Sequence, residues 1–465
     1  MPYAEVAVDA PAGRLLYSYA VPSELDLAPG HLVLVPFGPR TARGVVVDVV
    51  SSPAHEATRA VSSTVGGVRL SKVQLDVGLY VSRTYLSPPF AALALFLPPG
   101  VSREPAVFFA PVVPLPSPLP SLTPEEDTAL RTVHKEGRIS LGRFGSGRGA
   151  ASRMQALASL LERGLVYRLE EAAVPSGKAR TEAVVSLAVD ASEARIVAGS
   201  LAAGRSRRQA CVLEKLISQD GSTSLRTLRQ ECGATTASVA SMAARGLVTV
   251  SERRVWRETI SSRVPDEAQA PSLTSAQQVV WDQMVQRWHA AEPSEFVLFG
   301  VTGSGKTELY LRAAQHAIDS GKQVVCLVPE IVLASQTVER FVARFPGRVA
   351  VLHSGLTRGQ AYDEWDRIRG GACDVVVGAR SALFAPLERP GLFVLDEEHD
   401  WAYKQDDVMP RYHARTVARE YARQCGAVLL LGSATPDVET FSRAESGAAC
   451  LLELPGRVGD SPGLP

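Results

Sequence analysis

The chain has 465 residues, and its 49 acidic side chains balance its 49 basic ones, so the formal net charge is zero. This length predicts about three domains, and the charge balance excludes binding to nucleic acid or membranes through overall charge, so that a DNA-binding surface has to be local. The longest strongly apolar run, residues 90–97, lies between two Pro-Pro pairs and is far shorter than the ~20 residues of a transmembrane helix. We therefore expect no membrane span.

The N-terminal residues 1–6 contain no basic region followed by an apolar core, so we expect a cytoplasmic protein without a secretory signal. The six cysteines include no Cys-x-x-Cys pair, which argues against a zinc ribbon and a disulfide framework. We expect most of them to be small buried hydrophobes, and we expect no zinc site.

Residues 1–105 are predicted to form a small β-rich domain. Alternating or apolar runs indicate strands at residues 3–8, 32–35 and 44–50. Helical spacing at residues 73–81 ends before Pro88, because proline cannot continue a helix. Proline then occupies nearly every second position of residues 110–120, which predicts an extended linker over residues 106–121.

Residues 122–262 contain a weak internal repeat. A helix, the phrase Arg-Gly-Leu-Val and a strand follow one another twice, with the phrase at residues 163–166 and 245–248. This order suits winged-helix modules, so we predict a winged-helix-like region of one or two modules. Such modules often bind DNA through their second helix. The expected second helices, residues 140–144 and 224–230, carry few arginines, so a spacer role is an equal alternative.

Residues 263–454 are predicted to form a RecA-like parallel α/β lobe around a phosphate-binding loop. A buried strand at residues 295–299 leads into Gly300-x-x-x-x-Gly305-Lys306-Thr307, and a helix follows. Backbone N–H groups of such a loop surround a β-phosphate, and the helix N-terminus adds its positive dipole end. Lys306 would reach the β- and γ-phosphates and the Thr307 hydroxyl would hold Mg²⁺. The predicted ATP-binding residues are Gln277, as a reader of adenine, with Gly300, Thr302, Gly303, Ser304, Gly305, Lys306 and Thr307.

Further buried strands are expected at residues 323–328, 374–378, 392–395 and 428–432. Asp396 follows the third of these, where its carboxylate can accept from Mg²⁺-bound water, and Glu397 can orient or deprotonate the attacking water. Ser433 and Thr435 follow the last strand. We expect them to link the γ-phosphate to a neighbouring surface, with His399 completing the link by hydrogen bonding.

Residues 401–415 interleave aromatic and basic side chains in an expected loop. This pattern predicts a surface that stacks bases and neutralises phosphates, and the alternative is a partly buried aromatic cluster with charged edges. The predicted DNA-contacting residues of this loop are Trp401, Tyr403, Lys404, Arg411, Tyr412 and His413.

These motifs together resemble the PriA family of replication-restart DNA helicases, in helicase superfamily two. The similarity is dense over residues 273–439, including Asp396-Glu397-Glu398-His399, and residues 35–38 resemble the family's domain for the 3′ end of a nascent strand. The resemblance implies an ATP- and Mg²⁺-dependent motor that recognises stalled forks, moves 3′ to 5′ on single-stranded DNA and initiates primosome assembly. It also implies helicase-loading proteins and single-strand-binding protein as partners, places Arg380 on the DNA backbone, and makes residues 401–415 the loop that couples DNA to hydrolysis.

Two departures from the family matter. Tyr17-Ser18-Tyr19 stands where the family usually has Phe-Asp-Tyr, so we expect 3′-end recognition to be weaker, or to rely on Tyr17, Gly38 and Arg59. The family also continues into a second lobe with arginine fingers and a cysteine-rich zinc insertion, whose ligands are absent here. We expect a chain truncated after the first lobe, with residues 455–465 as a linker. Without the arginine fingers, we expect ATP hydrolysis to be about a thousandfold slower than with them. The alternative is a naturally short DNA-binding scaffold that retains an ATP-binding lobe.

Overall fold

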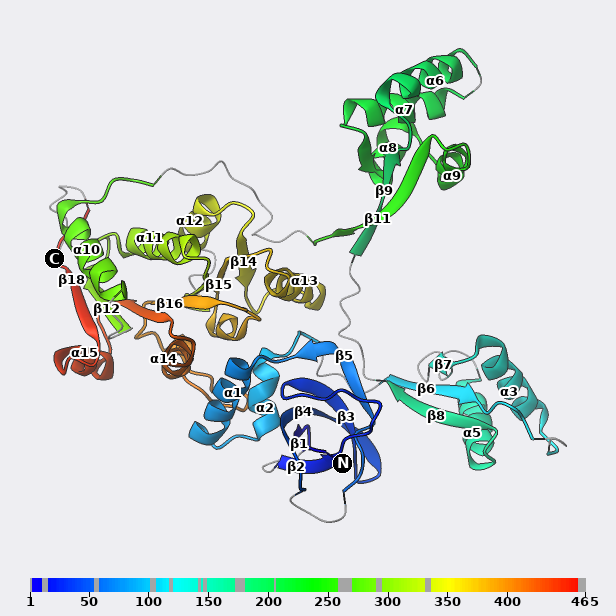
Figure 1. Ribbon diagram of the computed structural model, residues 1–465, viewed down its shortest axis with the longest axis horizontal. Coiled ribbons are helices and arrows are strands. Elements are labelled where there is room, and N and C mark those ends of the chain that lie inside the picture. The colour runs from blue at the N-terminus through cyan, green and yellow to red at the C-terminus, as the bar shows by residue number, and fades with distance from the viewer. Residues whose placement is uncertain are drawn as a thin grey trace. The chain divides into compact units, whose positions relative to one another are not determined.

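The computed structural model describes residues 2–10, 16–53, 58–100, 106–116, 120–140, 144, 149–171, 180–204, 206–257, 270–289, 295–330 and 336–458 (Figure 1). Across these residues, we find no helix that combines the length and the apolar character needed to cross a bilayer. The chain divides into two compact units, one of residues 177–258 and one of the remaining residues.

The N-terminal part is an antiparallel sheet of five strands in the order β2-β1-β4-β3-β5. Alternating side chains bury both faces: Ala4, Val6 and Val33 lie in one apolar cluster, and Ala7 and Leu32 lie in the other. The strands are β1 (Tyr3–Val8), β2 (Leu16–Ala20), β3 (His31–Phe37), β4 (Arg40–Val50) and β5 (Ser63–Arg69).

Helices cover the second face of this sheet and also pack on the C-terminal lobe. Helix α1 (Lys72–Thr84) begins at a capping box between Ser71 and Gln74; α2 (Pro89–Leu93) and the 3-10 helix η1 (Ala94–Phe96) follow. Helix α1 contacts α14 (Ala414–Cys425). The Phe96 ring meets those of Phe384 and Tyr421 edge-on, at centroid distances of 5.0 and 5.8 Å, so the two parts share one apolar core.

The middle of the chain forms two modules with the same sheet topology. In the first, the central strand β6 comes first in sequence and pairs with a short strand and a long one, in the order β7-β6-β8. Its elements are β6 (Ala106–Pro111), α3 (Pro124–Glu136), β7 (Ile139–Ser140), α5 (Ala150–Glu162) and β8 (Val166–Glu171). Strand β6 occupies residues predicted to be linker, so the prediction that the linker begins at residue 106 is wrong.

The second module repeats this arrangement in the order β10-β9-β11, within the separate unit. Its elements are β9 (Arg180–Leu187), α6 (Ala191–Ala203), α7 (Arg207–Ser218), β10 (Ser222–Ser224), α8 (Leu225–Cys232), α9 (Thr236–Ala244) and β11 (Val248–Val255). The order α7-β10-α8-α9-β11 is that of a winged helix. The second helix of its helix–turn–helix pair is therefore α9, not the segment 224–230 expected from the sequence, and α9 carries no basic side chain. The other expected second helix falls largely on residues 141–143, outside the described residues.

The C-terminal part is a RecA-like lobe with a seven-stranded parallel sheet, in the order β14-β15-β13-β16-β17-β12-β18. Both of its faces are buried, which explains why the strands are nearly continuous apolar runs. The strands are β12 (Glu295–Gly300), β13 (Gln323–Leu327), β14 (Val349–Leu352), β15 (Val375–Gly378), β16 (Pro390–Asp396), β17 (Val428–Ser433) and β18 (Cys450–Leu454).

The helices of this lobe divide between the two faces of the sheet. The apolar cluster on one face includes residues of α10 to α12, and the cluster on the other includes residues of α13 and α14, while α15 lies between β17 and β18 in the sequence. The helices are α10 (Ser275–His289), α11 (Lys306–Asp319), α12 (Gln336–Arg344), α13 (Arg358–Arg369), α14, α15 (Val438–Glu445) and the 3-10 helices η4 (Arg380–Phe384) and η5 (Trp401–Tyr403). The carboxyl ends of β12, β16 and β17 lie together, and the segments that follow them form the site described next.

Candidate nucleotide-binding and DNA-contacting sites

The segment between β12 and α11 has the geometry of a phosphate cradle. Gly303 and Gly305 each have a φ of +83°, a conformation that side chains beyond glycine rarely adopt. Helix α11 begins at Lys306, so its first N–H groups face the loop. Lys306 is buried and its Nζ donates to the Gly300 carbonyl at 2.7 Å, while the buried Ser304 hydroxyl has no partner among the described residues. This set of donors suits an anionic phosphate.

A cavity of about 650 Å³ opens in front of the loop. Thr302, Lys306 and Thr307 line one side of it, and the carboxylates of Asp396 and Glu397 line another. The described residues contain no cluster of three or more His, Cys, Asp or Glu side chains arranged to hold a metal. Mg²⁺ does not need such a cluster, because it binds through one or two carboxylates together with nucleotide phosphates and water. The residues present therefore fit a magnesium-bound nucleotide.

Gln277 lines the same cavity, but its amide is already engaged within the protein. Its Oε1 accepts from the Thr274 N–H at 3.0 Å and its Nε2 donates to the Ser304 carbonyl at 3.0 Å. The reading of adenine by Gln277 therefore stays a prediction. The side chain caps the start of α10 and braces the phosphate loop.

Asp396 ends β16 at the bottom of the cavity and is nearly buried. Its Oδ1 accepts from the Tyr310 hydroxyl at 3.0 Å and from the Glu397 N–H at 3.2 Å. Burial, and next the neighbouring Glu397 carboxylate, raise the pKa of Asp396 to about 6. Glu397 has a φ of +46°, an uncommon backbone conformation for a non-glycine residue and one that clusters at functional sites.

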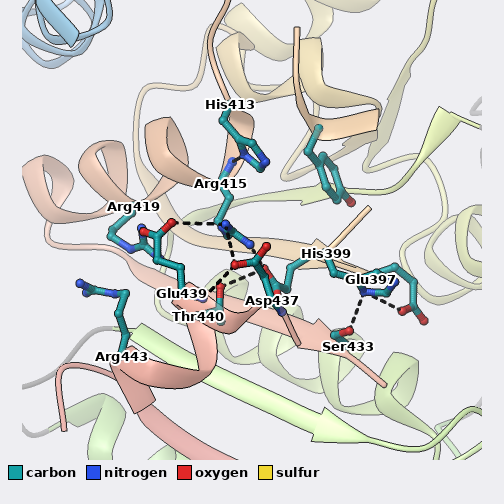
Figure 2. Close-up of polar contacts among 12 residues, drawn as sticks. Glu397, His399, His413, Arg415, Arg419, Ser433, Asp437, Glu439, Thr440 and Arg443 are labelled. Carbon is teal, nitrogen blue, oxygen red and sulfur yellow. Dashed lines mark hydrogen bonds and ion pairs between the residues drawn. The ribbon is translucent and has the colours of Figure 1, made fainter. Parts of the chain in front are cut away.

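The predicted link through His399 has its hydrogen bonds in place (Figure 2). The His399 Nδ1 lies 2.7 Å from the Ser433 hydroxyl and 3.7 Å from a Glu397 carboxylate oxygen. The Thr435 hydroxyl lies 3.4 Å from the His399 Nε2, and the Thr435 N–H donates to the Ser433 hydroxyl at 2.9 Å. The structure thus joins the end of β17 to the carboxylate expected to act on water.

The segment from residue 401 to residue 413 is more ordered than the predicted loop. It contains η5, and residues 404 and 413 form an antiparallel bridge before α14 begins. Tyr403 and Tyr412 are buried, and the Tyr403 hydroxyl donates to the Asp396 carbonyl at 2.6 Å and to the Leu327 carbonyl at 3.0 Å. The prediction that these two tyrosines stack on bases is therefore wrong here, because they are core residues. Trp401 remains 75% exposed.

The basic side chains of this segment also have protein partners. The Arg380 Nη1 donates to the carbonyls of Ala402 and Lys404, at 3.1 and 2.6 Å. Lys404 donates to the Arg411 carbonyl. Burial, followed by the charges of Arg415 and Lys404, lowers the pKa of His413. Arg380 therefore holds the segment in place through its backbone partners, and contacts of Arg380 and His413 with DNA stay predictions; Arg411 is exposed.

A buried ion pair that the sequence did not reveal connects three of these segments (Figure 2). Glu398 is fully buried, and its Oε2 lies 2.6 Å from Nη1 of Arg415, in the first turn of α14. The Thr440 hydroxyl donates to the same oxygen at 3.0 Å, and the Asp437 N–H donates to the other at 2.7 Å. Glu398 thus ties the carboxylate segment to the end of the aromatic segment and to α15. The only signal in the sequence was a second carboxylate beside Glu397.

In the N-terminal part, the structure separates the residues predicted for a 3′ end. The Tyr17 ring meets Phe37 at 5.3 Å, and the Arg59 Nη1 donates to the Gly38 carbonyl at 2.8 Å. Ser18 points to the opposite face of β2, because successive strand residues alternate. There its hydroxyl donates to the Glu5 carboxylate, directly across the pairing of β1 and β2, at 2.6 Å. A carboxylate is therefore present beside Ser18, supplied by another strand.

Known proteins are similar to this chain both in its N-terminal domain and in its C-terminal lobe. A profile of the DEAD/DEAH box helicases matches residues 274–444, and a profile of the 3′DNA-binding domain (3′BD) of PriA matches residues 5–98. The chain is 31% identical to the replication restart protein PriA of Bacillus subtilis (strain 168), across 98% of this chain and 56% of that protein. It is 32% identical to PriA of Synechocystis sp., across 99% of this chain and 56% of that protein. The chain belongs to the PriA family.

PriA of Haemophilus influenzae is 48% identical over 169 residues, which cover 36% of this chain and 23% of that protein. The chain spans about half the length of the Bacillus and Synechocystis PriA proteins. All of the sequence-predicted site residues lie inside the two segments matched by the PriA 3′BD and helicase profiles.

Proposed function

We propose that this chain provides the DNA-binding parts and the first ATPase lobe of an ATP-dependent 3′-to-5′ DNA helicase of replication restart. In this role it recognises stalled forks and initiates primosome assembly, with helicase-loading proteins and single-strand-binding protein as partners. One observation carries the proposal: the cavity that places the phosphate loop, through Lys306 and Thr307, opposite Asp396 and Glu397. Phosphoryl transfer needs both a phosphate cradle and a metal carboxylate.

Each residue of the cavity has a role in this proposal. The loop N–H groups and Lys306 hold the β- and γ-phosphates, and Thr307 and Asp396 hold Mg²⁺. The cation, when bound, neutralises charge that develops on the phosphates. Glu397 orients the attacking water and accepts its proton. Lys306, which donates to the Gly300 carbonyl in this structure, has to turn from it toward the phosphates.

The links to DNA in this proposal run through two sets of hydrogen bonds. His399 connects Glu397 to Ser433 and Thr435. Tyr403 and Arg380 fix the base of the 401–413 segment, from which Trp401 and Arg411 reach solvent to meet single-stranded DNA.

Hydrolysis of ATP tests the proposal against the alternative, an ATP-binding scaffold without motor activity. We expect single-stranded DNA to stimulate hydrolysis by this chain, and Glu397→Gln to reduce the stimulated rate at least a hundredfold, the typical contribution of a general base, while nucleotide binding persists. The measurement is phosphate release with and without a DNA oligonucleotide. Equal rates for the wild-type chain and Glu397→Gln would favour the scaffold.

We further propose that Glu5 supplies the carboxylate for the terminal nucleotide of a DNA 3′ end, in place of the family's aspartate. Glu5 lies directly opposite Ser18 in the pairing of β1 with the edge strand β2, on the face of β2 that Tyr17 does not occupy. Glu5→Gln is expected to reduce the preference for a free over a phosphorylated 3′ end about tenfold, in the range of one charged hydrogen bond. Anisotropy titrations of the two oligonucleotides measure it, with the exposed Glu24→Gln as control. An unchanged preference in Glu5→Gln would contradict the assignment.

A further inference from the structure

Tyr310 lies on α11, one helical turn after Lys306, and is fully buried. Its hydroxyl donates to the Asp396 carboxylate at 3.0 Å, across 86 residues of sequence. The phosphate loop and the carboxylate expected to hold Mg²⁺ belong to different strands, β12 and β16, which are separated in the sheet by β17. The Tyr310 hydroxyl is thus a direct bond between the helix that follows the phosphate loop and the metal carboxylate.

The space for this hydroxyl is provided by Gly432 on β17. Gly432 lies directly opposite Asp396 in the pairing of β16 and β17. A Cβ atom at position 432 would lie 1.7 Å from the Tyr310 hydroxyl oxygen, too close for the ring to stay where it is. The hydrogen bond between Tyr310 and Asp396 therefore depends on Gly432, which lies on a third segment. A substitution at Tyr310 and a substitution at Gly432 can each disturb this bond.

Only one oxygen of the Asp396 carboxylate accepts hydrogen bonds from the described residues. Both hydrogen bonds to its carboxylate that the structure shows, from Tyr310 and from the Glu397 N–H, end on Oδ1. Asp396 also lines the nucleotide cavity together with Lys306 and Thr307. A carboxylate fixed through one oxygen keeps the other available as a ligand, in the way that hydrogen bonds outside a metal's own ligands orient those ligands.

We propose that Tyr310 is a positioning residue for the metal carboxylate: it holds Oδ1 of Asp396 so that Oδ2 is presented to a divalent cation bound with nucleotide phosphates. This inference rests on the proposed ATP-binding function. It assigns the cation dependence of nucleotide binding, and not nucleotide binding itself, to the Tyr310 hydroxyl. A tyrosine that only fills the core would make no such distinction, because phenylalanine fills the same volume.

The test is a Mg²⁺ titration of the binding of a fluorescent ATP analogue to the full chain. For Tyr310→Phe, we expect the half-saturating Mg²⁺ concentration to rise about fivefold to tenfold, in the net range of one typical hydrogen bond. Binding of the analogue in excess EDTA and the midpoint of thermal unfolding should stay unchanged. Gly432→Ala should shift the Mg²⁺ dependence in the same direction, and the double variant should add little, because both changes act on one bond.

Tyr421→Phe is the matched control, since Tyr421 is equally buried in the same lobe but packs in the other apolar cluster, against Phe96 and Phe393. Unchanged Mg²⁺ dependence in Tyr310→Phe, with a wild-type chain that binds Mg²⁺ and nucleotide, would overturn the inference and leave the proposed function standing. Loss of binding in EDTA to the same extent would also overturn it, by showing a structural role only. A wild-type chain that binds no nucleotide would overturn both.

Discussion

Replacing Glu398 with alanine is expected to lower the free energy of unfolding of the helicase lobe by about 3–5 kcal/mol, the cost of removing one partner of a buried ion pair. The substitution leaves the Arg415 guanidinium, whose side chain is 6% exposed, without its closest carboxylate. It also removes the acceptors of the Asp437 N–H and the Thr440 hydroxyl. Urea unfolding followed by circular dichroism measures the change.

The same lobe provides a control pair with the same closest distance. Glu420 lies 2.6 Å from Arg423, as Glu398 does from Arg415, but the Arg423 side chain is 70% exposed. Glu420→Ala should therefore cost less than about 1 kcal/mol, as solvent-exposed pairs do. If Glu398→Ala and Glu420→Ala lowered the free energy of unfolding equally, burial would not explain how strongly the Glu398 network stabilises the lobe.

Gly305→Ala is expected to weaken binding of Mg·ATP at least tenfold. An alanine there has to adopt a φ of +83°, at a cost of about 1–2 kcal/mol, and its Cβ would lie 2.2 Å from the Gln277 Nε2. Relief of this clash requires the loop or the Gln277 brace to move, and the N–H groups that surround a phosphate then move too. Titration with a fluorescent ATP analogue measures the affinity.

Two further variants separate the backbone strain from the clash. Gly347 has a similar φ of +74° with open space around it, so Gly347→Ala should reduce stability without changing nucleotide affinity. Combining Gly305→Ala with Gln277→Ala removes the clashing amide and should recover part of the affinity. No recovery in that double variant would show that Gln277 does not brace the loop.

The features that the sequence predicted well are those that a short segment specifies by itself. The strand, glycine loop and helix around Lys306 are consecutive, and Asp396 follows directly on a buried apolar strand. The link from His399 to Ser433 was expected because His399 comes directly after the carboxylates and Ser433 follows a predicted strand, and parallel strands bring their carboxyl ends together. The edge strand β18 and strand β14 were not predicted.

The errors concern burial and contacts between distant segments. Tyr403 and Tyr412 belong to an aromatic and basic pattern that is the same whether the rings face solvent or the core, and only the tertiary packing shows that they are buried. Gln277 was assigned to adenine from the paired donor and acceptor of its amide, and its hydrogen bond to the Ser304 carbonyl, on another segment, was not expected. The residues Glu5, Tyr310 and Glu398 were missed for the same reason, since each acts through a side chain far away in sequence.

Direct binding of Mg·ATP to the wild-type chain and to Lys306→Ala tests most directly whether the loop and carboxylates form one nucleotide site. We expect the wild-type chain to bind a fluorescent ATP analogue and Lys306→Ala to bind it at least tenfold more weakly, because a buried ammonium that meets the β- and γ-phosphates is lost. The exposed Arg358→Ala, on α13, should bind as the wild-type chain does. Equal affinities of the wild-type chain and Lys306→Ala would contradict the assignment of the site.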